Sequence, residues 1–581
     1  MVYSKLKVFK KRKNVGIPIQ GQVVGSHGEC SSINNNQFAP PPSSSQKKLN
    51  GLEGYSVYEE ECSETDVNHI FNLNILCDVF LNYTQCKECG KNGLKLEADR
   101  TVGLATLFRL YCDNCEISKI FCSSYERHNE DRPSPKSKFY DINERLVYAL
   151  RAIGKGAAAA SALCGIMNLP PPPQKFGKYN EFIGNIAEDV AIESMKNAIE
   201  EAVVENNNIG DLSVALDGSW QKRGHTSMNG VVTATSVDTG KVIGVAVMST
   251  YCRCPNKKEH SENCTANYSG NSGGMEVAGV VKIFQQSEPC DKVRYINYLG
   301  DGDSKAYKAI NELKPYGENV PITKLECIGH VQKRMGTRLR RLKTSYKGKK
   351  LQDGKSLDGK NRLTEAVIDQ IQNYYGMAIR QNVNSAENMR KAVWAVLFHI
   401  SSSDDKPNHG LCPEGRNSWC KYNKAKATGE QFTHKRPLPH AIVEVIKYVF
   451  RDLSDIQLLK KCLHGRTQNP NESIKSVIWT RIPKTVFVSI NTLHFGVYDA
   501  VGTFNDGNIA RCEVLKRLLT NVGFFTIKSL IILDKERLRA SEKAVKDIES
   551  RARQQRRAAK RKLQDEDEED ADNPSYGAGM H

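Results

Sequence analysis

Short apolar runs between residues 210 and 331 give the clearest structural pattern in the chain. The runs that we expect to form strands are Leu212–Leu216, Val231–Ser236, Val242–Ser249, Val293–Leu299 and Thr323–Ile328. Tight turns such as Asp238–Gly240 separate the first three runs, which predicts an antiparallel meander. Helical patterns at Met275–Gln286 and Ser304–Leu313 precede the later two runs, which we therefore expect to add in parallel. The first and fourth strands are then neighbours in one sheet.

This order of elements is typical of an α/β, RNase H-like sheet domain. Two short helical patterns around Gly154 fit either a helix-turn-helix or an ordinary helical hairpin, and a further helix is expected over Ala187–Val204. We expect the following segments: a disordered basic tail at 1–50, a zinc-ribbon-like module at 51–125, a helical, candidate DNA-binding module at 140–205, the first part of the RNase H-like core at 206–332, a helical insertion at 333–431, the second part of the core at 432–530, and a charged C-terminal helix, starting near Asp534, with an acidic tail at 531–581.

Charge narrows the classes of partner. The 581 residues carry a formal net charge of +17 and a pI near 9.0, which favours a polyanion, although a basic surface that only aids solubility gives the same charge. No apolar run approaches the roughly 18 residues of a membrane span. The N-terminus lacks the apolar segment of a secretory signal, so we expect the 18 cysteines to lie in a reducing compartment. The basic run Lys10–Lys13 is typical of a nuclear address and equally of a solvated tail.

Acidic residues lie where the predicted elements would bring them together. Asp217 follows the first strand, Asp301 follows the fourth, and Glu472 opens a later helix. Carboxylates so arranged can hold two Mg²⁺ ions about 3.5–4 Å apart for phosphoryl transfer. Each has a plainer interpretation when taken alone, because both aspartates suit turns and Glu472 suits a capping box that starts at Asn469. Asp303 is an alternative to Asp301.

Cysteine spacing predicts a structural zinc site. Cys86-x2-Cys89 and Cys112-x2-Cys115 form two knuckles, which together supply four thiolates, with strand-like sequence between them as in a zinc ribbon. Two looser sets are candidate zinc sites: Cys252, Cys254, His260 and Cys264, and then His399, His409, Cys412 and Cys420. The first of these favours a zinc loop, whereas the second is equally compatible with unligated side chains.

A Cys327-x2-His330 motif and a basic run follow the fifth predicted strand. Two ligands alone are a weak metal signal, so this pair fits a metal site, a brace for the active site, or a phosphate contact by His330. The basic residues that we expect to contact DNA phosphates are Lys333, Arg334, Arg338, Arg340 and Arg341. A solvated face is the ordinary interpretation of such a run.

A series of motifs runs through the chain from about Tyr83 to Gly523. They are Asp217-Gly218-Ser219-Trp220, Cys252-x-Cys254, Asn267-Tyr268-x-Gly270, Met275-Glu276, Gly300-Asp301-Gly302-Asp303-Ser304-Lys305, Cys327-x2-His330-x2-Lys333-Arg334-Met335, Tyr374-Tyr375-Gly376-x-Ala378-Ile379-Arg380, Ser418-Trp419-Cys420, and Asn469-x-Asn471-Glu472-Ser473 with Trp479 and Pro483-Lys484. In this order they resemble the Mutator-like transposase domain of animal DNA transposons. The resemblance implies an RNase H-like DDE core with a helical insertion before the glutamate, Asp217, Asp301 and Glu472 as the metal-binding triad, and Cys327 and His330 as the C-x2-H pair.

We therefore expect a cut-and-paste DNA transposase of the nucleus that uses Mg²⁺ or Mn²⁺ for catalysis and Zn²⁺ for structure. Its expected partners are double-stranded DNA, as terminal inverted repeats and target, and further copies of itself, with no membrane. One alternative is a domesticated, catalytically inactive nuclear DNA-binding protein. A second is a cellular RNase H-like nuclease that acts on RNA or hybrids.

Overall fold

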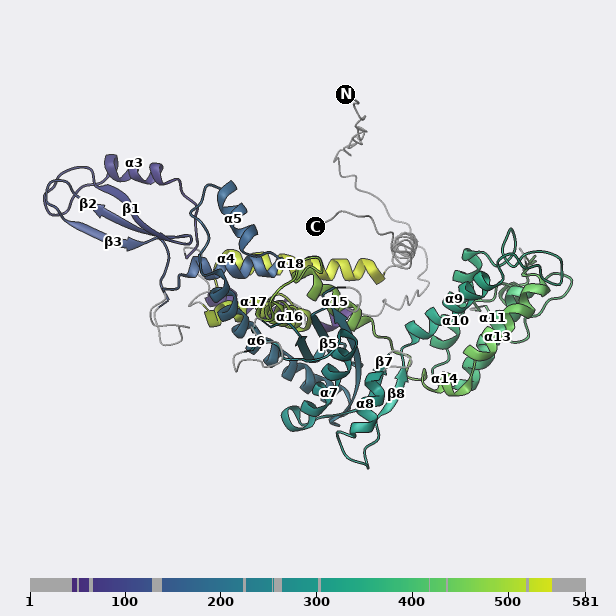
Figure 1. Ribbon diagram of the computed structural model, residues 1–581. Coiled ribbons are helices and arrows are strands. Elements are labelled where there is room, and N and C mark those ends of the chain that lie inside the picture. Colours follow the sequence, from purple (N-terminus) through teal and green to yellow (C-terminus); the bar gives the residue numbers. More distant parts are fainter. Residues whose placement is uncertain are drawn as a thin grey trace, which may run out of the picture. The chain divides into compact units, whose positions relative to one another are not determined.

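The computed structural model shows a mixed α/β fold with two separate sheets (Figure 1). The described residues are 44–49, 52–61, 66–127, 138–222, 226–252, 254, 264–300, 305–416, 418–434, 437–518 and 522–545. Within these ranges, no helix is both long and apolar enough to cross a membrane.

The larger sheet has five strands in the order β6-β5-β4-β7-β8. Their bounds are β4 Asp211–Trp220, β5 Asn229–Ser236, β6 Val242–Ser249, β7 Arg294–Gly300 and β8 Thr323–Glu326. β5 pairs antiparallel with both β4 and β6, whereas β7 pairs parallel with both β4 and β8. The antiparallel meander and the parallel additions expected from the apolar pattern are confirmed, and β4 and β7 are neighbours.

Strand β4 is longer than the apolar run that predicted it. We expected this strand to end at Leu216, but it continues to Trp220 because residues 217 to 219 extend the ladder with β5. Asp217 therefore lies inside the strand and not after its end. Side chains alternate between the faces of a strand, so Asp217 shares a face with Ala215.

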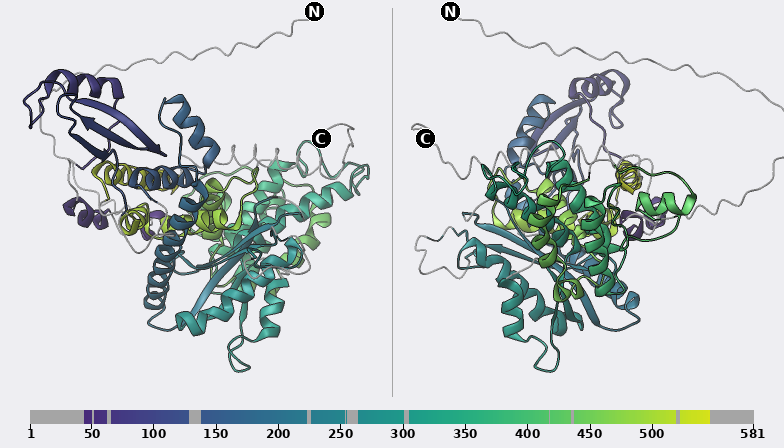
Figure 2. Two further views of the ribbon diagram at one scale, coloured as in Figure 1. Left: turned by 60° about the vertical axis from the view of Figure 1, so that its left-hand side comes forward. Right: turned by 90° about the vertical axis from the view of Figure 1, so that its right-hand side faces the viewer.

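Helices cover both faces of this sheet (Figures 1 and 2). One face carries α7 (Ser272–Asp291) and α8 (Lys305–Leu313), which pack on Leu212, Val214 and Leu216 of β4. The other face carries α15 (Asn469–Arg481) and α16 (Ile490–Asp506), which pack on Val231 and Val247. Asp217 lies on the α15 side, because its strand neighbours on the opposite face contact α7.

A second helical core adjoins α16. It contains α4 (Asp141–Ala152), the first half of α6 (Phe176–Glu205), α17 (Ile509–Leu518) and α18 (Phe524–Val545). We expected the α6 helix to begin only at Ala187 and the C-terminal helix near Asp534. Both begin earlier, because Tyr179 and Ile183 of α6 and Ile527 and Leu530 of α18 are buried in this core. The other helices near the N-terminal side are α1 (Ser44–Lys48), η1 (Glu53–Tyr55), α2 (Ser56–Glu61) and α5 (Ala157–Ile166).

The smaller sheet belongs to the cysteine-bearing segment. Helix α3 (Leu73–Tyr83) precedes the antiparallel strands β1 (Lys95–Val102), β2 (Ala105–Tyr111) and β3 (Ser118–Cys122). Strands β1 and β2 lie between the two CxxC knuckles, as the sequence predicted. Asn143 of α4 connects this sheet to the helical core, because its side chain accepts from Leu104 N at 2.8 Å and donates to Val102 O at 2.8 Å.

Helices between β8 and α15 form a core of their own. They are α9 (Ile328–Ser345), α10 (Glu365–Arg380), α11 (Ala386–Ser401), α13 (His440–Leu453) and α14 (Ile456–Lys460). Helix α12 (Lys421–Thr428) lies in the same segment but contributes no residue to this core. We call residues 328–463 the helical excursion, since one apolar cluster extends from Ile328 to Leu463. The insertion expected at 333–431 lies inside it, and α13, beyond that range, packs against α9 and α11.

The two ends of the helical excursion are hydrogen-bonded to each other. Glu326 N donates to Lys461 O at 3.0 Å, Ile328 N donates to Arg466 O at 3.4 Å, and His464 Nε2 lies 3.0 Å from Glu326 O. We call this contact the neck. The chain therefore returns to the end of β8 just before α15 begins.

A buried carboxylate joins four of the helices beside the sheet. Asp499 of α16 contacts Arg481 of α15 at 2.5 Å and Arg511 of α17 at 3.2 Å, and it accepts from the Tyr148 hydroxyl of α4 at 3.0 Å. Burial alone would raise the pKa of Asp499, but the Arg511 and Arg481 guanidiniums outweigh burial and hold the pKa well below its ordinary value. The helix that carries Glu472 is thereby tied to the core at its C-terminal end.

We predict that Asp499→Asn lowers the free energy of unfolding by about 3–5 kcal/mol, because two buried guanidiniums lose their counter-charge. Chemical denaturation measures this change. The matched control is Asp452→Asn, which removes a surface partner of Arg338 at 3.4 Å and should cost less than about 1 kcal/mol. Equal effects of the two substitutions would contradict the prediction.

Candidate active site

Asp217 faces the first turns of α15. Its carboxylate forms an ion pair with Lys475 Nζ, which also donates to Gly218 O at 2.7 Å. One turn further along the helix, Trp479 Nε1 donates to Ser219 Oγ at 2.8 Å. These contacts attach the C-terminal half of β4 to α15.

Glu472 lies one turn before Lys475 on the same side of α15. We considered a capping box from Asn469 to Glu472, and this alternative is wrong: the N-cap is Gln468, and its side chain does not cap the helix. The Glu472 carboxylate instead lies 3.4 Å from Lys333 Nζ and 4.0 Å from His330 Nε2, both on α9. Its side chain is 55% exposed, so the carboxylate is open to a ligand.

The predicted second aspartate falls beyond the part of the chain that can be described. Asp301 and its alternative Asp303 lie outside the described residues, in the gap after β7. Strand β7 ends at Gly300, and in the parallel ladder Leu299 is paired with Ala215 of β4. The choice between Asp301 and Asp303 stays a prediction.

Gln468 connects the start of α15 to both central strands. Its side-chain Nε2 donates to Leu216 O at 2.9 Å and to Leu299 O at 3.0 Å, and its backbone N donates to Cys327 Sγ at 3.3 Å. The residue is 2% exposed, so these bonds are shielded from water. Leu216 directly precedes Asp217, and Leu299 is the last residue of β7 that pairs with β4. Sequence reasoning missed Gln468 and Lys475.

The C-x2-H motif is divided between two roles. Cys327 is buried against Ala215 and Leu299 and accepts the Gln468 hydrogen bond, so it braces the start of α15. His330, one turn later, lies beside Glu472. Among the described residues, neither belongs to a group whose ligand atoms are close enough to share a metal. Of the three interpretations that the sequence left open, the contacts favour the brace for Cys327.

Most of the predicted DNA-contacting residues on α9 are paired with carboxylates. Arg334 contacts Glu326 at 2.7 Å, Arg338 contacts Asp452 at 3.4 Å, and Arg340 contacts Glu365 at 2.9 Å and Asp369 at 2.7 Å. Lys333 contacts Glu472, as described above, and Arg341 is exposed. Most of these cations are therefore ion-paired with acidic side chains of the same region.

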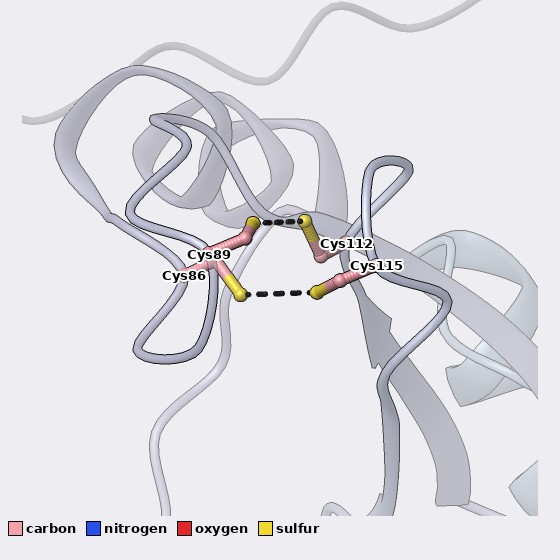
Figure 3. Close-up of side chains that lie close together, drawn as sticks. All are labelled: Cys86, Cys89, Cys112 and Cys115. Carbon is pink, nitrogen blue, oxygen red and sulfur yellow. Dashed lines mark hydrogen bonds between the residues drawn. The ribbon is translucent and has the colours of Figure 1, made fainter.

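The two CxxC knuckles face each other as the spacing predicted (Figure 3). Cys86 Sγ lies 3.5 Å from Cys115 Sγ, and Cys89 Sγ lies 3.6 Å from Cys112 Sγ. A tetrahedral zinc ion with Zn–S bonds of about 2.3 Å places sulfurs about 3.8 Å apart, so the donor set fits. The Lys91 backbone N–H lowers the pKa of the Cys89 thiol to about 6. At Cys115 the Ile117 N–H also lowers the pKa, but the neighbouring Cys86 sulfur and burial outweigh it and raise the pKa to about 12, so the two thiols differ in their tendency to form the thiolate that a metal requires.

Two further groups can hold a metal. Cys252, Cys254 and Cys264 have sulfurs within 4.8 Å of one another, whereas His260, the predicted fourth ligand, lies outside the described residues. His399, His409, Cys412 and Cys420 also place their ligand atoms within 4.8 Å. The structure therefore brings together each predicted set as far as it can be described.

A model of the Mutator-like transposase family matches residues 66–420. The chain belongs to the Mutator-like transposase family. The match includes Asp217, Cys327, His330 and the cysteine-histidine groups, and it ends before α15. No curated protein matches the chain. Membership of this family implies DNA binding and nuclease or transferase chemistry in general terms.

We predict that Gln468→Ala lowers the free energy of unfolding by about 2–4 kcal/mol, because two buried carbonyls lose their donor and each costs about 1–3 kcal/mol when unsatisfied. Chemical denaturation followed by circular dichroism measures it. Gln457→Ala is the control: Gln457 is exposed on α14, and its loss should change stability by less than about 0.5 kcal/mol. A Gln468→Ala protein as stable as the control would refute the brace.

Proposed function

We propose that this protein is a DNA transposase that binds transposon ends and catalyses metal-dependent cleavage and strand transfer. The observation that carries the proposal is the attachment of α15 to the sheet beside two carboxylates. Gln468 bonds to Leu216, the residue before Asp217, and Glu472 lies one helical turn after Gln468. Family membership supplies the general class of reaction.

The proposed fold of the catalytic core is RNase H-like. Its support is the strand order β6-β5-β4-β7-β8, with an antiparallel meander followed by parallel strands. Such a sheet places residues of neighbouring β4 and β7 side by side. Asp217 follows Ala215 by two positions, and Asp301 follows its partner Leu299 by two positions. We propose on this basis that Asp301 is the second aspartate.

Carboxylate oxygens suit Mg²⁺ and Mn²⁺, so the donor set fits the proposed ion. Bound there, the ion would supply the Lewis acid that activates water for cleavage and then the freed 3′-OH for strand transfer. Asp217 and Glu472 would hold it. Lys475 and Lys333 each contact one of these carboxylates, so they balance acidic charge that would otherwise repel a DNA phosphate. His330 lies beside Glu472 and is placed to contact a phosphate.

The remaining proposals concern partners and place of action. Exposed cations on α9 would contact DNA beside Glu472, exchanging carboxylate partners for phosphates.

We propose that the Cys86 to Cys115 knuckles hold structural zinc. We also propose that the transposase acts in the nucleus as a homo-oligomer on terminal inverted repeats and target DNA. The basic run Lys10–Lys13, which supports a nuclear address, lies outside the described residues.

The deciding experiment is a cleavage and strand-transfer assay on DNA that carries the element's own ends, with Mg²⁺ or Mn²⁺. We expect Asp217→Asn and Glu472→Gln to lose cleavage while folding and end binding stay nearly intact, because each removes one metal-binding charge. Glu444→Gln, at an exposed position of α13, is the matched control and should cut at the wild-type rate. End binding without cutting by the unmodified protein would favour the domesticated alternative, and cutting confined to hybrids would favour the nuclease.

A separate prediction concerns Lys475, whose ammonium competes with a cation for Asp217. Lys475→Gln should tighten Mn²⁺ binding about twofold to fivefold, the equivalent of an ion pair worth up to about 1 kcal/mol. Titration of free Mn²⁺ by electron paramagnetic resonance measures the change. Lys447→Gln, which loses a partner on α13 at 3.7 Å, should leave the affinity unaltered. Weaker Mn²⁺ binding by Lys475→Gln would show that Lys475 positions Asp217 for the ion.

A further inference from the structure

The loop between α11 and α13 is held by very few apolar side chains. Among its described residues, the buried apolar cluster consists of Cys412 and Cys420 with Ala395 of α11, and Trp419 and Tyr422 pack against them. Helix α12 within this loop has a single buried residue, Ala425. A segment of this length needs another source of order, because so small a core cannot offset the conformational entropy of its backbone.

Four nitrogen and sulfur atoms meet inside this loop. His399 lies in the last turn of α11, His409 and Cys412 lie in the loop, and Cys420 is the N-cap of α12. The two Nδ1 atoms are 3.3 Å apart, and His409 Nδ1 lies 3.7 Å from Cys412 Sγ and 3.4 Å from Cys420 Sγ. A tetrahedral ion with Zn–N bonds of about 2.05 Å and Zn–S bonds of about 2.3 Å requires about 3.3 Å between nitrogens and 3.5–3.6 Å between nitrogen and sulfur.

A hydrogen-bond chain lies behind His409. His434 Nδ1 lies 2.6 Å from Asp404 Oδ1, and its Nε2 lies 2.8 Å from His409 Nε2. Ser402 Oγ lies 2.9 Å from the same His409 atom and 3.2 Å from His434 Nε2. A His409 side chain that donates from Nε2 to one of these neighbours keeps its lone pair on Nδ1, the atom that faces His399 and the two sulfurs.

We propose that the helical excursion contains a structural zinc site, with His399 Nδ1, His409 Nδ1, Cys412 Sγ and Cys420 Sγ as ligands and His434 and Asp404 as positioning residues. Two nitrogens and two sulfurs in a closed, buried set suit Zn²⁺. Metal-bound histidines generally donate their other N–H to a partner that fixes the ring, and the Asp404–His434–His409 chain has that form. The sequence indicated the four ligands, and the structure adds the coordinating atoms and the chain behind them.

The ion would join α11 to α12 and so hold the whole loop. Loop residues Leu411, Pro413 and Trp419, each next to a ligand, line a cavity of about 360 Å³. Tyr374 of α10, whose ring centroid lies 5.4 Å from that of Trp419, and Lys391 of α11 line the same cavity. The zinc site therefore sets the shape of this cavity, and its function is structural and independent of the carboxylates at α15.

The first test uses the unmodified full chain and hydrogen exchange. Removing zinc with a chelator should raise amide exchange over residues 402–434 while α13 stays protected, and adding Zn²⁺, but not Mg²⁺, should restore protection. Unchanged exchange over 402–434 on removal of all bound zinc would overturn the proposal. This test needs no variant, so it does not depend on whether a substituted protein folds.

The second test counts zinc and measures its affinity. Cys412→Ser/Cys420→Ser should contain one zinc equivalent fewer than the unmodified chain by mass spectrometry, whereas His440→Ala, at an exposed position of α13, should contain the same number. Equal zinc contents of the double variant and the unmodified chain would overturn the site. His434→Ala and Asp404→Asn should keep the equivalent but bind it about 10–100-fold more weakly in competition with a chromophoric chelator. Unaltered affinity in both would overturn the positioning role.

Discussion

The side-chain amide of Gln468 makes the contact on which the candidate active site depends. Backbone hydrogen bonds of the sheet fix β4 relative to β7. They do not include α15, which follows the helical excursion in the chain. Two buried bonds from one amide, to Leu216 O and Leu299 O, set the position of its first turn. Cys327 adds a third bond from the end of β8. At the other end of α15, Arg481 and Asp499 fix the helix to the core, so Glu472 lies between two anchored points.

The sequence predicted the features whose signals are local. Strand order followed from alternation and turns, and each metal-ligand set followed from spacing. The sequence also shows four residues at helical spacing, Gln468, Glu472, Lys475 and Trp479. This spacing alone does not predict what their side chains contact. The partners of Gln468 are 252 and 169 residues away in the sequence, and the chain has other glutamines with no such role. The same holds for His434, whose partner Asp404 is 30 residues away.

Local patterns also misplaced several boundaries, and the cause is tertiary packing. Strand β4 runs past its apolar stretch because β5 offers partners to Gly218 and Ser219. Helix α6 begins early because Tyr179 and Ile183 reach a core made by distant helices. Net charge overstates the free positive charge of the surface for a similar reason. It counts the α9 arginines as free cations, although they form ion pairs with Glu326, Asp452 and Glu365. The pairs of Arg338 with Asp452 and of Arg340 with Glu365 are largely exposed and are worth at most about 1 kcal/mol each, whereas the Glu326 partner of Arg334 is buried.

The neck has a consequence for how this architecture can change over evolutionary time. Because the chain leaves at Glu326 and returns at Lys461 and Arg466, whatever lies between is closed off at one point. Closing a longer segment costs only about 0.6 kcal/mol for each doubling of its length. The excursion can therefore grow or shrink while the neck keeps the same entry to α15. We expect such changes of length beyond α9, because His330 and Lys333 of α9 lie beside Glu472.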